Sequence, residues 1–506
     1  MINTDDGFLR LFEHIAEEEP DRPYASFEGA GALTFAELDR RAGRLAAWLA
    51  AQGVERENRV ALMMRNGETS LALLFAIAKA GAVWVPVNTA SVGDNLAYIL
   101  EHSEPALVVA DDDLLAVVAA AGMLARVAPS SDAARFMQDA SSPSLAASRA
   151  PTDADLPYAI MYTSGTTGAP KGVIVSHRML RLSGEGVALV AQTEPGDVMF
   201  MWEPFFHIGG AQMIVLPLIR DVTLALVDRF SASRFWRQVV EARSTHIHFL
   251  GGILQILLKQ PESPLDRAHK VRLAWGGGAP RDIWRPFEER FGVTIRECYG
   301  MTECSSLTTA NRNGVLGSAG TPVPWLDVEI LREDGTPVGI GEQGEIVVSE
   351  RVRGAVTKGY FRNPEATAKA LRGGRFHTGD FGSWEAAGNM FFHGRMTDSA
   401  RVRGQNVSAY EVESVAAKHP DVEDCALLPV AAEVGEQDIK LFVKAKPGAV
   451  IEAAALSAWL EPRLAPFQWP RYIAIIADFE RTPSLRIMKH KLSKRTDDAW
   501  DRLAKG

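Results

Sequence analysis

Segments with helical and strand periodicity alternate along most of the chain, and this alternation limits the possible folds more than any other feature. FAELDRRAGRLAAWLAAQG repeats apolar residues at intervals of three and four and ends at Gly53, as a helix does before a C-terminal glycine. RVALMMRN then reads as a strand, the next stretch as a helix, and VWVPVN as another strand. This pattern predicts an α/β fold with a parallel sheet.

The length and the later change in pattern indicate more than one domain. The 506 residues exceed one ordinary core of roughly 250 to 300 residues. DVEILREDGTPV and GEIVVSE read as strands around tight turns, so we expect a β-rich subdomain over about residues 320–395. Further on, NVSAYEVESVAAKHP and AALSAWLEPRLA read as helices, and CALLPVA and IKLFVKAK as strands. We therefore predict a large domain over residues 1–397 and a small α+β domain over residues 398–506.

Charge and hydropathy exclude several classes of protein. A net charge of -9 offers no basic surface for nucleic acid. The apolar run SLALLFAIAKAGAVWVPV is broken by Lys79, Gly81 and Pro86, which favours a buried helix leading into a strand over a membrane span. The acidic N-terminus lacks the pattern of a signal peptide, and three cysteines fit neither a disulfide framework nor a zinc site. We expect a cytoplasmic protein without a membrane span.

The glycine-rich stretch YTSGTTGAPKG, residues 162–172, has the composition of a phosphate-binding loop. Glycines let backbone N–H groups turn inward, hydroxyl groups add donors, and Lys171 supplies a positive charge for phosphate oxygens. The P-loop pattern GxxxxGK[ST] is not met, because Gly172 follows Lys171. Taken alone, the stretch also fits an exposed linker between strands.

The same stretch resembles the phosphate loop of the AMP-forming adenylating superfamily of acyl-CoA ligases, peptide-synthetase adenylation domains and luciferases. Other motifs of that superfamily follow in its order: PFFHIGG, GGGAP, YGMTE, GEIVV, KGYFRNPEAT, HTGD and GRMTDSARVRGQNVSAYEVE. Within the superfamily the chain is most similar to crotonobetaine/carnitine-CoA ligase-like acyl-CoA synthetases. The resemblance implies a C-terminal domain that moves between two half-reactions, and ATP, Mg²⁺ and coenzyme A as cofactors.

The resemblance also implies roles for single residues. Tyr299 would stack on adenine, Thr302 would contact phosphate and act in catalysis, and Glu303 would hold Mg²⁺. Asp380 would accept hydrogen bonds from the ribose hydroxyls, and Arg395 would add a ribose or phosphate contact. The loop residues expected around the ATP phosphates are Thr163, Ser164, Gly165, Thr166, Thr167, Gly168 and Lys171. The other residues expected at the nucleotide are Gly276, Gly277, Gly278, Ala279, Pro280, Gly300 and Met301.

The C-terminal signature departs from that of the superfamily. In ERTPSLRIMKHKL, Leu485 replaces a glycine and Arg486 stands where the catalytic lysine belongs. Arg486 keeps a positive charge, but its planar guanidinium needs more room than an ammonium group. Lys489 or Lys491 is the alternative, by a shift of register, although for Lys491 a solvated tail fits better. Asp398 occupies the hinge position, and the residues expected near CoA are Arg401, Arg403 and Gly404.

By position, the acid pocket should contain aromatic, imidazole and glycine residues. His207 would flank the pocket and help to admit the carboxylate, while paired glycines would enlarge it. The residues expected to line it are Trp202, His207, His248, Gly251, Gly252 and Trp275. His246 and His248 would share one face of a strand, where we expect a pair at a strand edge without a metal.

These observations favour an AMP-forming ligase that joins a small carboxylic acid to CoA, and a homodimer is one option for its assembly. One alternative is an adenylate-forming enzyme with another acceptor: an amine, a carrier thiol, or an aryl amine that attacks activated nitrite. The other is a nucleotide-binding homologue whose adenylation is impaired by Arg486. Intact Lys171, Glu303, Asp380 and Arg395 argue against loss of turnover.

Overall fold

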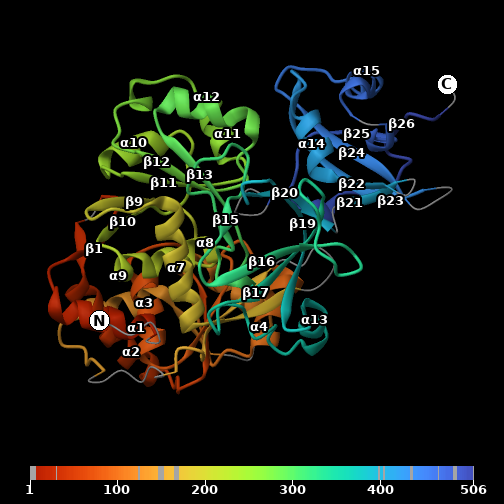
Figure 1. Cartoon of the computed structure of the whole chain (residues 1–506). Helices are drawn as coiled ribbons and strands as arrows, with labels where there is room; N and C mark the ends of the chain where they lie inside the picture. Colours follow the sequence, from red (N-terminus) through yellow and green to blue (C-terminus); the bar gives the residue numbers. More distant parts are fainter. Residues whose placement is uncertain are drawn as a thin grey trace. The chain divides into compact units, whose positions relative to one another are not determined.

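The structure is a computed structural model that divides into two compact units (Figure 1). The first unit comprises Met1–Val328 and Val348–Phe376, and the second comprises Glu329–Val347 and His377–Gly506. The residues that the structure describes are 7–29, 31–122, 126–145, 153–163, 170–396, 399–402, 405–432, 437–464, 466–481 and 487–504. The mixed α/β class, with a large N-terminal and a small C-terminal part, is as expected. The boundary at residue 398 stays a prediction.

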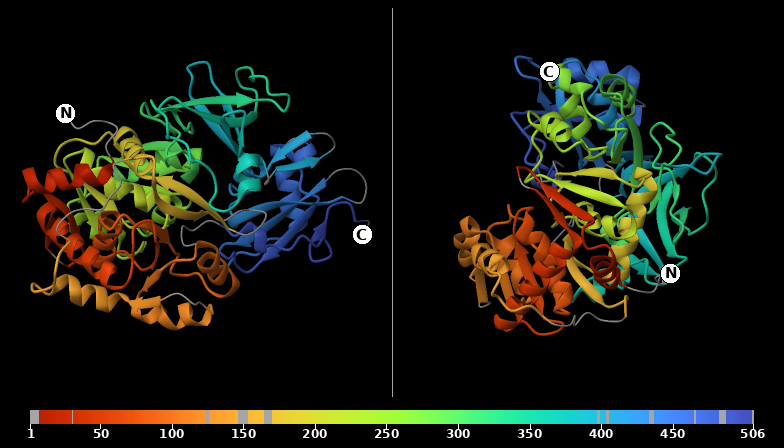
Figure 2. Two further views of the ribbon diagram at one scale, coloured as in Figure 1. Left: turned by 90° about the horizontal axis from the view of Figure 1, so that it is seen from below. Right: turned by 90° about the vertical axis from the view of Figure 1, so that its left-hand side faces the viewer.

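A nine-stranded sheet forms the centre of the first unit. The run from β13 through β12, β11, β9 and β10 to β1 is parallel, as predicted, whereas β2, β14 and β15 pair antiparallel at its two ends. In sheet order the strands are β15 (Thr321–Pro322), β14 (Thr309–Ala310), β13 (Thr294–Tyr299), β12 (Leu273–Gly277), β11 (His246–Leu250), β9 (Asp197–Met201), β10 (Val222–Leu226), β1 (Pro23–Phe27) and β2 (Ala32–Thr34). Strand β1 from the N-terminal segment therefore pairs with β10. In both views of Figure 2 the red segment around β1 lies beside the yellow segments near residue 220.

A second sheet of the first unit carries the glycine-rich loop between its last two strands. In sheet order it contains β6 (Arg126–Pro129), β5 (Leu107–Ala110), β3 (Arg59–Met63), β4 (Val83–Pro86), β7 (Pro157–Thr163) and β8 (Lys171–Ser176). Strands β3, β4, β5, β6 and β7 are parallel to their neighbours, and β8 returns antiparallel beside β7. An apolar cluster that includes Val85, Leu96 and Val108 lies under this sheet.

Helices cover both faces of the nine-stranded sheet. Helices α11 and α12 pack on β11 and β13, and α7 packs on β12 and β13 from the opposite face (Figure 1). The helices of the first unit are α1 (Phe8–Glu18), α2 (Phe35–Ala51), α3 (Glu68–Lys79), α4 (Gly93–Ser103), α5 (Leu115–Ala120), α6 (Ser130–Gln138), α7 (His177–Ala191), α8 (Ile208–Ala211), α9 (Leu216–Ile219), α10 (Phe235–Glu241), α11 (Ile253–Leu258), α12 (Arg281–Phe291) and α13 (Pro364–Ala370).

The sequence explains the two helices that it predicted most clearly. Helix α2 begins with a capping box, in which Thr34 accepts from the amide of Glu37 and the Glu37 carboxylate accepts from the amide of Thr34. It ends just before Gly53, whose φ of +82° is the left-handed conformation that a glycine adopts without strain. In α3 every residue from Ser70 to Lys79 is buried, which confirms the buried helix before β4. Among the described residues, no helix combines the length and apolar character needed to cross a membrane.

Strands between residues 326 and 395 form a separate five-stranded sheet, as the β-rich pattern predicted. The chain passes between the two units within three of these strands, β16, β17 and β19. The strands are β16 (Leu326–Leu331), β17 (Gly344–Glu350), β18 (Leu371–Arg372), β19 (Arg375–Trp384) and β20 (Met390–Arg395).

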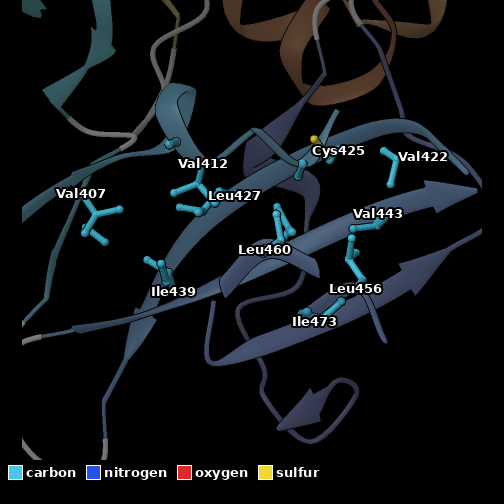
Figure 3. Close-up of a cluster of buried hydrophobic side chains, with 14 of the residues drawn as sticks. Val407, Val412, Val422, Cys425, Leu427, Ile439, Val443, Leu456, Leu460 and Ile473 are labelled. Atoms are coloured by element: carbon cyan, nitrogen blue, oxygen red, sulfur yellow. The ribbon is translucent and has the colours of Figure 1, made fainter. Parts of the chain in front are cut away.

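The second unit has its own apolar core on a four-stranded sheet (Figure 3). The side chains of successive residues in β23 point to opposite faces of the sheet. Cys425 and Leu427 belong to the cluster of Figure 3, whereas Ala426 and Leu428 belong to a second cluster. Helices α14 and α15 pack on the sheet. The elements are β21 (Ser399–Val402), β22 (Gln405–Ser408), α14 (Ala409–Ala416), β23 (Val422–Ala431), β24 (Gln437–Ala445), α15 (Ala453–Leu460), β25 (Tyr472–Ile476) and β26 (Trp500–Asp501).

One sequence assignment in this unit is wrong at its start. NVSAYEVESVAAKHP reads as a helix throughout, but its first three residues belong to β22, and α14 begins only at Ala409. Ladder hydrogen bonds with β21, where Arg401 lies opposite Asn406, hold these residues in a hairpin. Pairing with a neighbouring strand therefore overrides the local pattern.

Candidate active site

The glycine-rich loop connects two adjacent antiparallel strands of the first unit. Thr163 at the end of β7 pairs with Lys171 at the start of β8, and Thr163 Oγ1 donates to the Lys171 carbonyl oxygen at 3.4 Å. The predicted loop residues Ser164, Gly165, Thr166, Thr167 and Gly168 lie outside the described residues. The sheet thus fixes both ends of the loop and brings Thr163 and Lys171 together.

Lys171, Tyr360 and Glu303 form one connected group in the first unit. The Tyr360 hydroxyl donates to Glu303 Oε1 at 2.9 Å, and Lys171 Nζ lies 5.2 Å from the centroid of the Tyr360 ring. Tyr360 is 9% exposed, so its ring is held by packing. A cation over an aromatic face is attracted by the ring quadrupole. Tyr360 therefore links Lys171, at one end of the glycine-rich loop, to the carboxylate expected at the metal.

Sequence reasoning missed Tyr360, although the signal was present. The residue lies in the motif KGYFRNPEAT, which contributed to the family resemblance but to which no role was given. Its backbone neighbours also hold the loop strand, because the amide of Phe361 donates to the carbonyl of Gly172 at 2.7 Å. A tyrosine two residues after Lys358 is unremarkable until the fold brings it beside Glu303.

The YGMTE segment lies in a tight turn after β13. Tyr299 is buried at the end of that strand, and its carbonyl accepts from the amide of Thr308 at 2.8 Å. A side chain at Gly300 would clash with the carbonyl of Ser306, so glycine is required by this close approach. Thr302 and Glu303 follow in a short 3₁₀ turn and are both buried. Tyr299, Gly300, Met301, Thr302 and Glu303 are thus presented together by one turn.

The chemistry of this turn fits a magnesium ion that is held partly by substrate. Mg²⁺ often binds to proteins through one or two carboxylates, with phosphate oxygens and water completing the octahedron. Glu303 supplies such a carboxylate and is linked to Lys171 through Tyr360. Among the described residues, no group of three histidine, cysteine or acidic side chains is arranged to hold a metal by itself. The Glu303 carboxylate therefore fits a magnesium ion whose other ligands are phosphate oxygens and water.

Glu297 fixes the GGGAP segment at the end of β12. Its Oε1 atom accepts from the amides of Gly278 and Ala279 at 2.9 and 3.2 Å. Burial raises the pKa of Glu297 to about 8, while the two amide donors lower it. A Cβ at Gly276 would clash with the carbonyl of Phe249, which explains that glycine. Gly277 ends β12, and Pro280 is the residue before α12.

Three of the residues predicted for the acid pocket lie side by side. The His248 ring centroid is 4.2 Å from that of Trp275 and 6.1 Å from that of Trp202. Trp202 Nε1 donates to the His248 carbonyl at 2.8 Å, and the three side chains are buried. His207 precedes α8, and its ring lies against that of Phe206. Beside β11, a Cβ at Gly251 would meet nothing within 4 Å and one at Gly252 only Gln255 Oε1, at 3.9 Å.

The two histidines of β11 do not sit at a sheet edge, contrary to expectation. β11 lies between β12 and β9, in the interior of the nine-stranded sheet. His246 Nε2 contacts the carbonyl of Ala191 at 2.9 Å, and its Nδ1 lies 2.9 Å from Thr245 Oγ1. His248 instead lies beside the carboxylate of Glu203. Each imidazole therefore has protein neighbours of its own rather than a shared ligand.

In the second unit, the predicted ribose residues face each other across a strand pair. Asp380 on β19 pairs with Arg395 on β20, and Arg395 Nε lies 3.7 Å from Asp380 Oδ1. The carboxylate is buried, whereas Arg395 is 45% exposed. Glu345 fixes the preceding turn, because its carboxylate accepts from the amide of Gly379 at 3.2 Å and lies 2.8 Å from His377 Nδ1. A missed residue, Glu345, thus positions the HTGD segment.

The residues expected to act from the C-terminal part are described only in part. Asp398, Arg403, Gly404 and Arg486 lie outside the described residues, and Arg401 lies on β21. The two alternatives to Arg486 both have partners within the second unit. Lys489 Nζ pairs with Glu413 Oε1 at 2.8 Å, and Lys491 pairs with Glu480.

Comparison with known proteins identifies the family. The AMP-binding enzyme model matches residues 12–361, and the model of the AMP-binding enzyme C-terminal domain matches residues 411–485. The chain is 31% identical over 504 residues to a sulfoacetate–CoA ligase of Cupriavidus necator, with 96% of this chain and 97% of that protein covered. It is 34% identical over 481 residues to a feruloyl-CoA synthase of an Amycolatopsis species, with 92% and 94% covered.

Two further matches agree with the expected relatives and fold. A crotonobetaine/carnitine–CoA ligase of Salmonella paratyphi B is 28% identical over 509 residues, with 96% of this chain and 98% of that protein covered. The crystal structure of ATP-bound MatB from Rhodopseudomonas palustris superposes with a TM-score of 0.82 at 27% identity, covering 95% of this chain and 97% of that chain.

These matches define the class of protein. The chain belongs to the AMP-binding enzyme family. Its relatives named above include three CoA ligases or synthases, and the activity of the chain is that of an AMP-forming acid–thiol ligase. ATP and CoA are the cosubstrates of this class.

Proposed function

We propose that the protein joins a small carboxylic acid to CoA in two half-reactions, with Mg²⁺–ATP as the nucleotide, in the cytoplasm. The observation that carries the proposal is the group formed by Lys171, Tyr360 and Glu303. It sets a cation and a carboxylate at one site beside the loop strands. ATP bound as a magnesium complex requires both kinds of group.

In the first half-reaction, a carboxylate oxygen of the acid attacks the α-phosphorus of ATP. The bond to the β-phosphate oxygen breaks, so acyl-AMP forms and pyrophosphate leaves. Lys171 and the loop amides stabilise the negative charge on the phosphates, and Thr302 adds a hydroxyl contact. Glu303 would hold Mg²⁺, which supplies charge neutralisation at the phosphate oxygens.

Other residues would bind the adenosine part of ATP and the carboxylic acid. Tyr299 stacks on adenine, Asp380 accepts from the ribose hydroxyls, and Arg395 adds a polar contact. His207 admits the carboxylate of the acid, and Arg486 supplies a positive charge during adenylation in place of a lysine. This assignment is supported by Lys489, whose ammonium group already pairs with Glu413.

In the second half-reaction, the thiol of CoA attacks the carbonyl carbon of acyl-AMP. The thioester bond forms, AMP leaves with the electrons of the broken C–O bond, and the thiol proton is released. Rotation of the C-terminal domain about Asp398 brings Arg401, Arg403 and Gly404 to the thiol site. The altered segment around Arg486 supports a second candidate function. In that case the protein forms an acyl-adenylate but transfers the acyl group to a different acceptor, such as an amine.

The names of the relatives do not define the acid. One is a sulfoacetate–CoA ligase and another a feruloyl-CoA synthase, so one acid carries a second anion and the other is aromatic. The proposed substrate is therefore a small carboxylic acid. The pocket residues would select the chemical group at the end of the acid away from its carboxylate.

Exchange of labelled pyrophosphate into ATP tests the proposal. We expect exchange to require both an acid and Mg²⁺, and addition of CoA to convert exchange into net AMP release. Net AMP release that is the same with and without CoA would contradict the thiol acceptor. No exchange with any acid would contradict the first half-reaction.

A further inference from the structure

Glu203 places a buried carboxylate beside the residues proposed for the acid pocket. It follows Trp202 directly after β9, and its side chain is only 4% exposed. His248 Nδ1 lies 3.0 Å from Glu203 Oε2. The two atoms are not aligned as a hydrogen bond, and Oε2 has no hydrogen-bond partner among the described residues. A buried carboxylate without aligned donors is costly, so a ligand that donates to it is favoured.

The backbone around Glu203 is fixed by a neighbouring segment of the chain. Asn66 Nδ2 donates to the Glu203 carbonyl at 2.8 Å, and Asn66 Oδ1 accepts from the amide of Phe205 at 3.0 Å. Asn66 lies between β3 and α3, both of which are buried in the first unit. The backbone of the turn that carries Glu203 is therefore held at two points.

Glycine makes room for the carboxylate. A Cβ at Gly209 would clash with both carboxylate oxygens of Glu203. Gly209 lies two residues after His207, the residue proposed to admit the acid. The carboxylate therefore occupies the place that any other residue at position 209 would fill.

Aromatic rings flank the His248 imidazole that lies beside this carboxylate. Trp202 and Trp275 flank His248, with ring centroids 6.1 and 4.2 Å from the imidazole. Trp202 Nε1 is already committed to the His248 carbonyl. Within the described part of the chain, neither lysine nor arginine pairs with Glu203. Aromatic faces attract cations and repel anions.

A neighbouring thiol reports the same electrostatic character. Burial raises the pKa of Cys298, and the carboxylates of Glu297 and Glu203 raise it further. Cys298 lies on β13, and its Sγ donates at 3.2 Å to the carbonyl of Gly276 on β12, the strand that carries Trp275. The Glu203 carboxylate thus acts on a second buried group besides His248, and its charge disfavours another negative charge close by.

We propose that Glu203 is a specificity residue of the acid pocket, which selects acids whose far end carries a hydrogen-bond donor and no second negative charge. A hydroxyl or an ammonium group satisfies this requirement, because each donates to a carboxylate. A second carboxylate or a sulfonate would meet Glu203 as a like charge. The inference rests on the proposed function, since it assumes that the acid lies against Trp202, His248 and Trp275.

Matched acids on the purified full-length protein test the inference. One series is benzoate with hydroxyl, aminomethyl, methyl or carboxylate at the 4-position, and the other is pentanoate with the same four groups at its end. The readout is kcat/KM for acid-dependent pyrophosphate exchange. We expect the best donor-bearing acid of the preferred series to exceed its methyl analogue at least tenfold, and the dianionic acid to be the poorest. The hydroxyl and aminomethyl arms distinguish a neutral donor from a cation.

Glu203→Gln supplies the second measurement, with Glu241→Gln as the matched control on an exposed position of α10. We expect Glu203→Gln to reduce the preference for the donor-bearing acid at least tenfold and to raise the relative rate of the dianionic acid. Glu241→Gln should keep the wild-type order. A wild-type enzyme that prefers the dianionic acid, or a Glu203→Gln enzyme with an unchanged order, would overturn the inference alone.

The two proposals fail differently in this experiment. If the wild-type protein exchanges pyrophosphate with some acids but ranks them without regard to the donor, the function stands and the role of Glu203 is refuted. If no acid supports exchange, the proposed function and the inference are both refuted. If Glu203→Gln does not fold, the ranking of acids by the wild-type protein still decides the question.

Discussion

Replacing Tyr360 by phenylalanine removes one hydrogen bond from the proposed ATP site and leaves the ring in place. The Tyr360 hydroxyl donates to Glu303 Oε1 at 2.9 Å, while Lys171 Nζ lies over the ring at 5.2 Å from its centroid. A hydrogen bond to a charged group contributes about 1.5 to 3 kcal/mol. If Glu303 holds the metal, this loss lowers kcat/KM for Mg²⁺–ATP by roughly 10- to 150-fold, since each 1.4 kcal/mol is about tenfold.

The assay is pyrophosphate exchange with a saturating acid, measured over a range of free Mg²⁺. We expect Tyr360→Phe to need more Mg²⁺ for half-maximal exchange and Tyr360→Ala, which also removes the ring under Lys171, to be more impaired. Thermal unfolding of each variant without nucleotide separates a folding defect from a weakened site. A folded Tyr360→Phe enzyme with the Mg²⁺ dependence and kcat/KM of the wild type would refute the reasoning.

Three other substitutions test separate parts of the account. Arg486→Ala should slow acyl-AMP formation by about 10²- to 10³-fold but spare thioester formation from supplied acyl-AMP, and an equal loss in both steps would remove Arg486 from the first. Leu427→Ala, at a position fully buried in the core of Figure 3, should destabilise the second unit by about 2–5 kcal/mol by hydrogen exchange, whereas the exposed Leu503→Ala should change stability by less than about 0.5 kcal/mol. Burial raises the pKa of Glu297 to about 8, against an ordinary 4.5. The stability that its carboxyl group contributes is therefore fully present below pH 4.5 and is lost as the pH rises to about 8. Glu297→Gln should therefore gain stability relative to the wild type from pH 5 to pH 8 in chemical denaturation, and a difference independent of pH would contradict the burial of that carboxyl group.

The parts of the fold that local periodicity specifies were predictable from sequence. Helix α2 carries its own start and stop signals in Thr34, Glu37 and Gly53, and the unbroken burial of α3 is visible as an apolar run. The start of α14 was not predictable in this way. Residues 406–408 have a helical pattern but pair with β21, and strand pairing is a contact between segments that a local pattern does not contain.

The residues of the candidate site show the same difference between local sequence patterns and long-range contacts. Motif residues such as Lys171, Glu303 and Asp380 could be named from sequence because each belongs to a recognisable segment. Tyr360 and Glu203 could not, because their importance arises from contacts with residues 57 and 45 positions away. The expectation of an edge strand for His246 failed for the same reason, since strand order is set by the whole sheet.

Identification of the product formed with and without CoA tests the central claim most directly. The purified protein is incubated with Mg²⁺–ATP and a panel of short, branched, aromatic and steroid-like acids, and the products are read by mass spectrometry. The account predicts that at least one acid yields AMP, pyrophosphate and the corresponding acyl-CoA when CoA is present. Acyl-AMP that accumulates untouched by CoA, or no turnover with any acid, would contradict it.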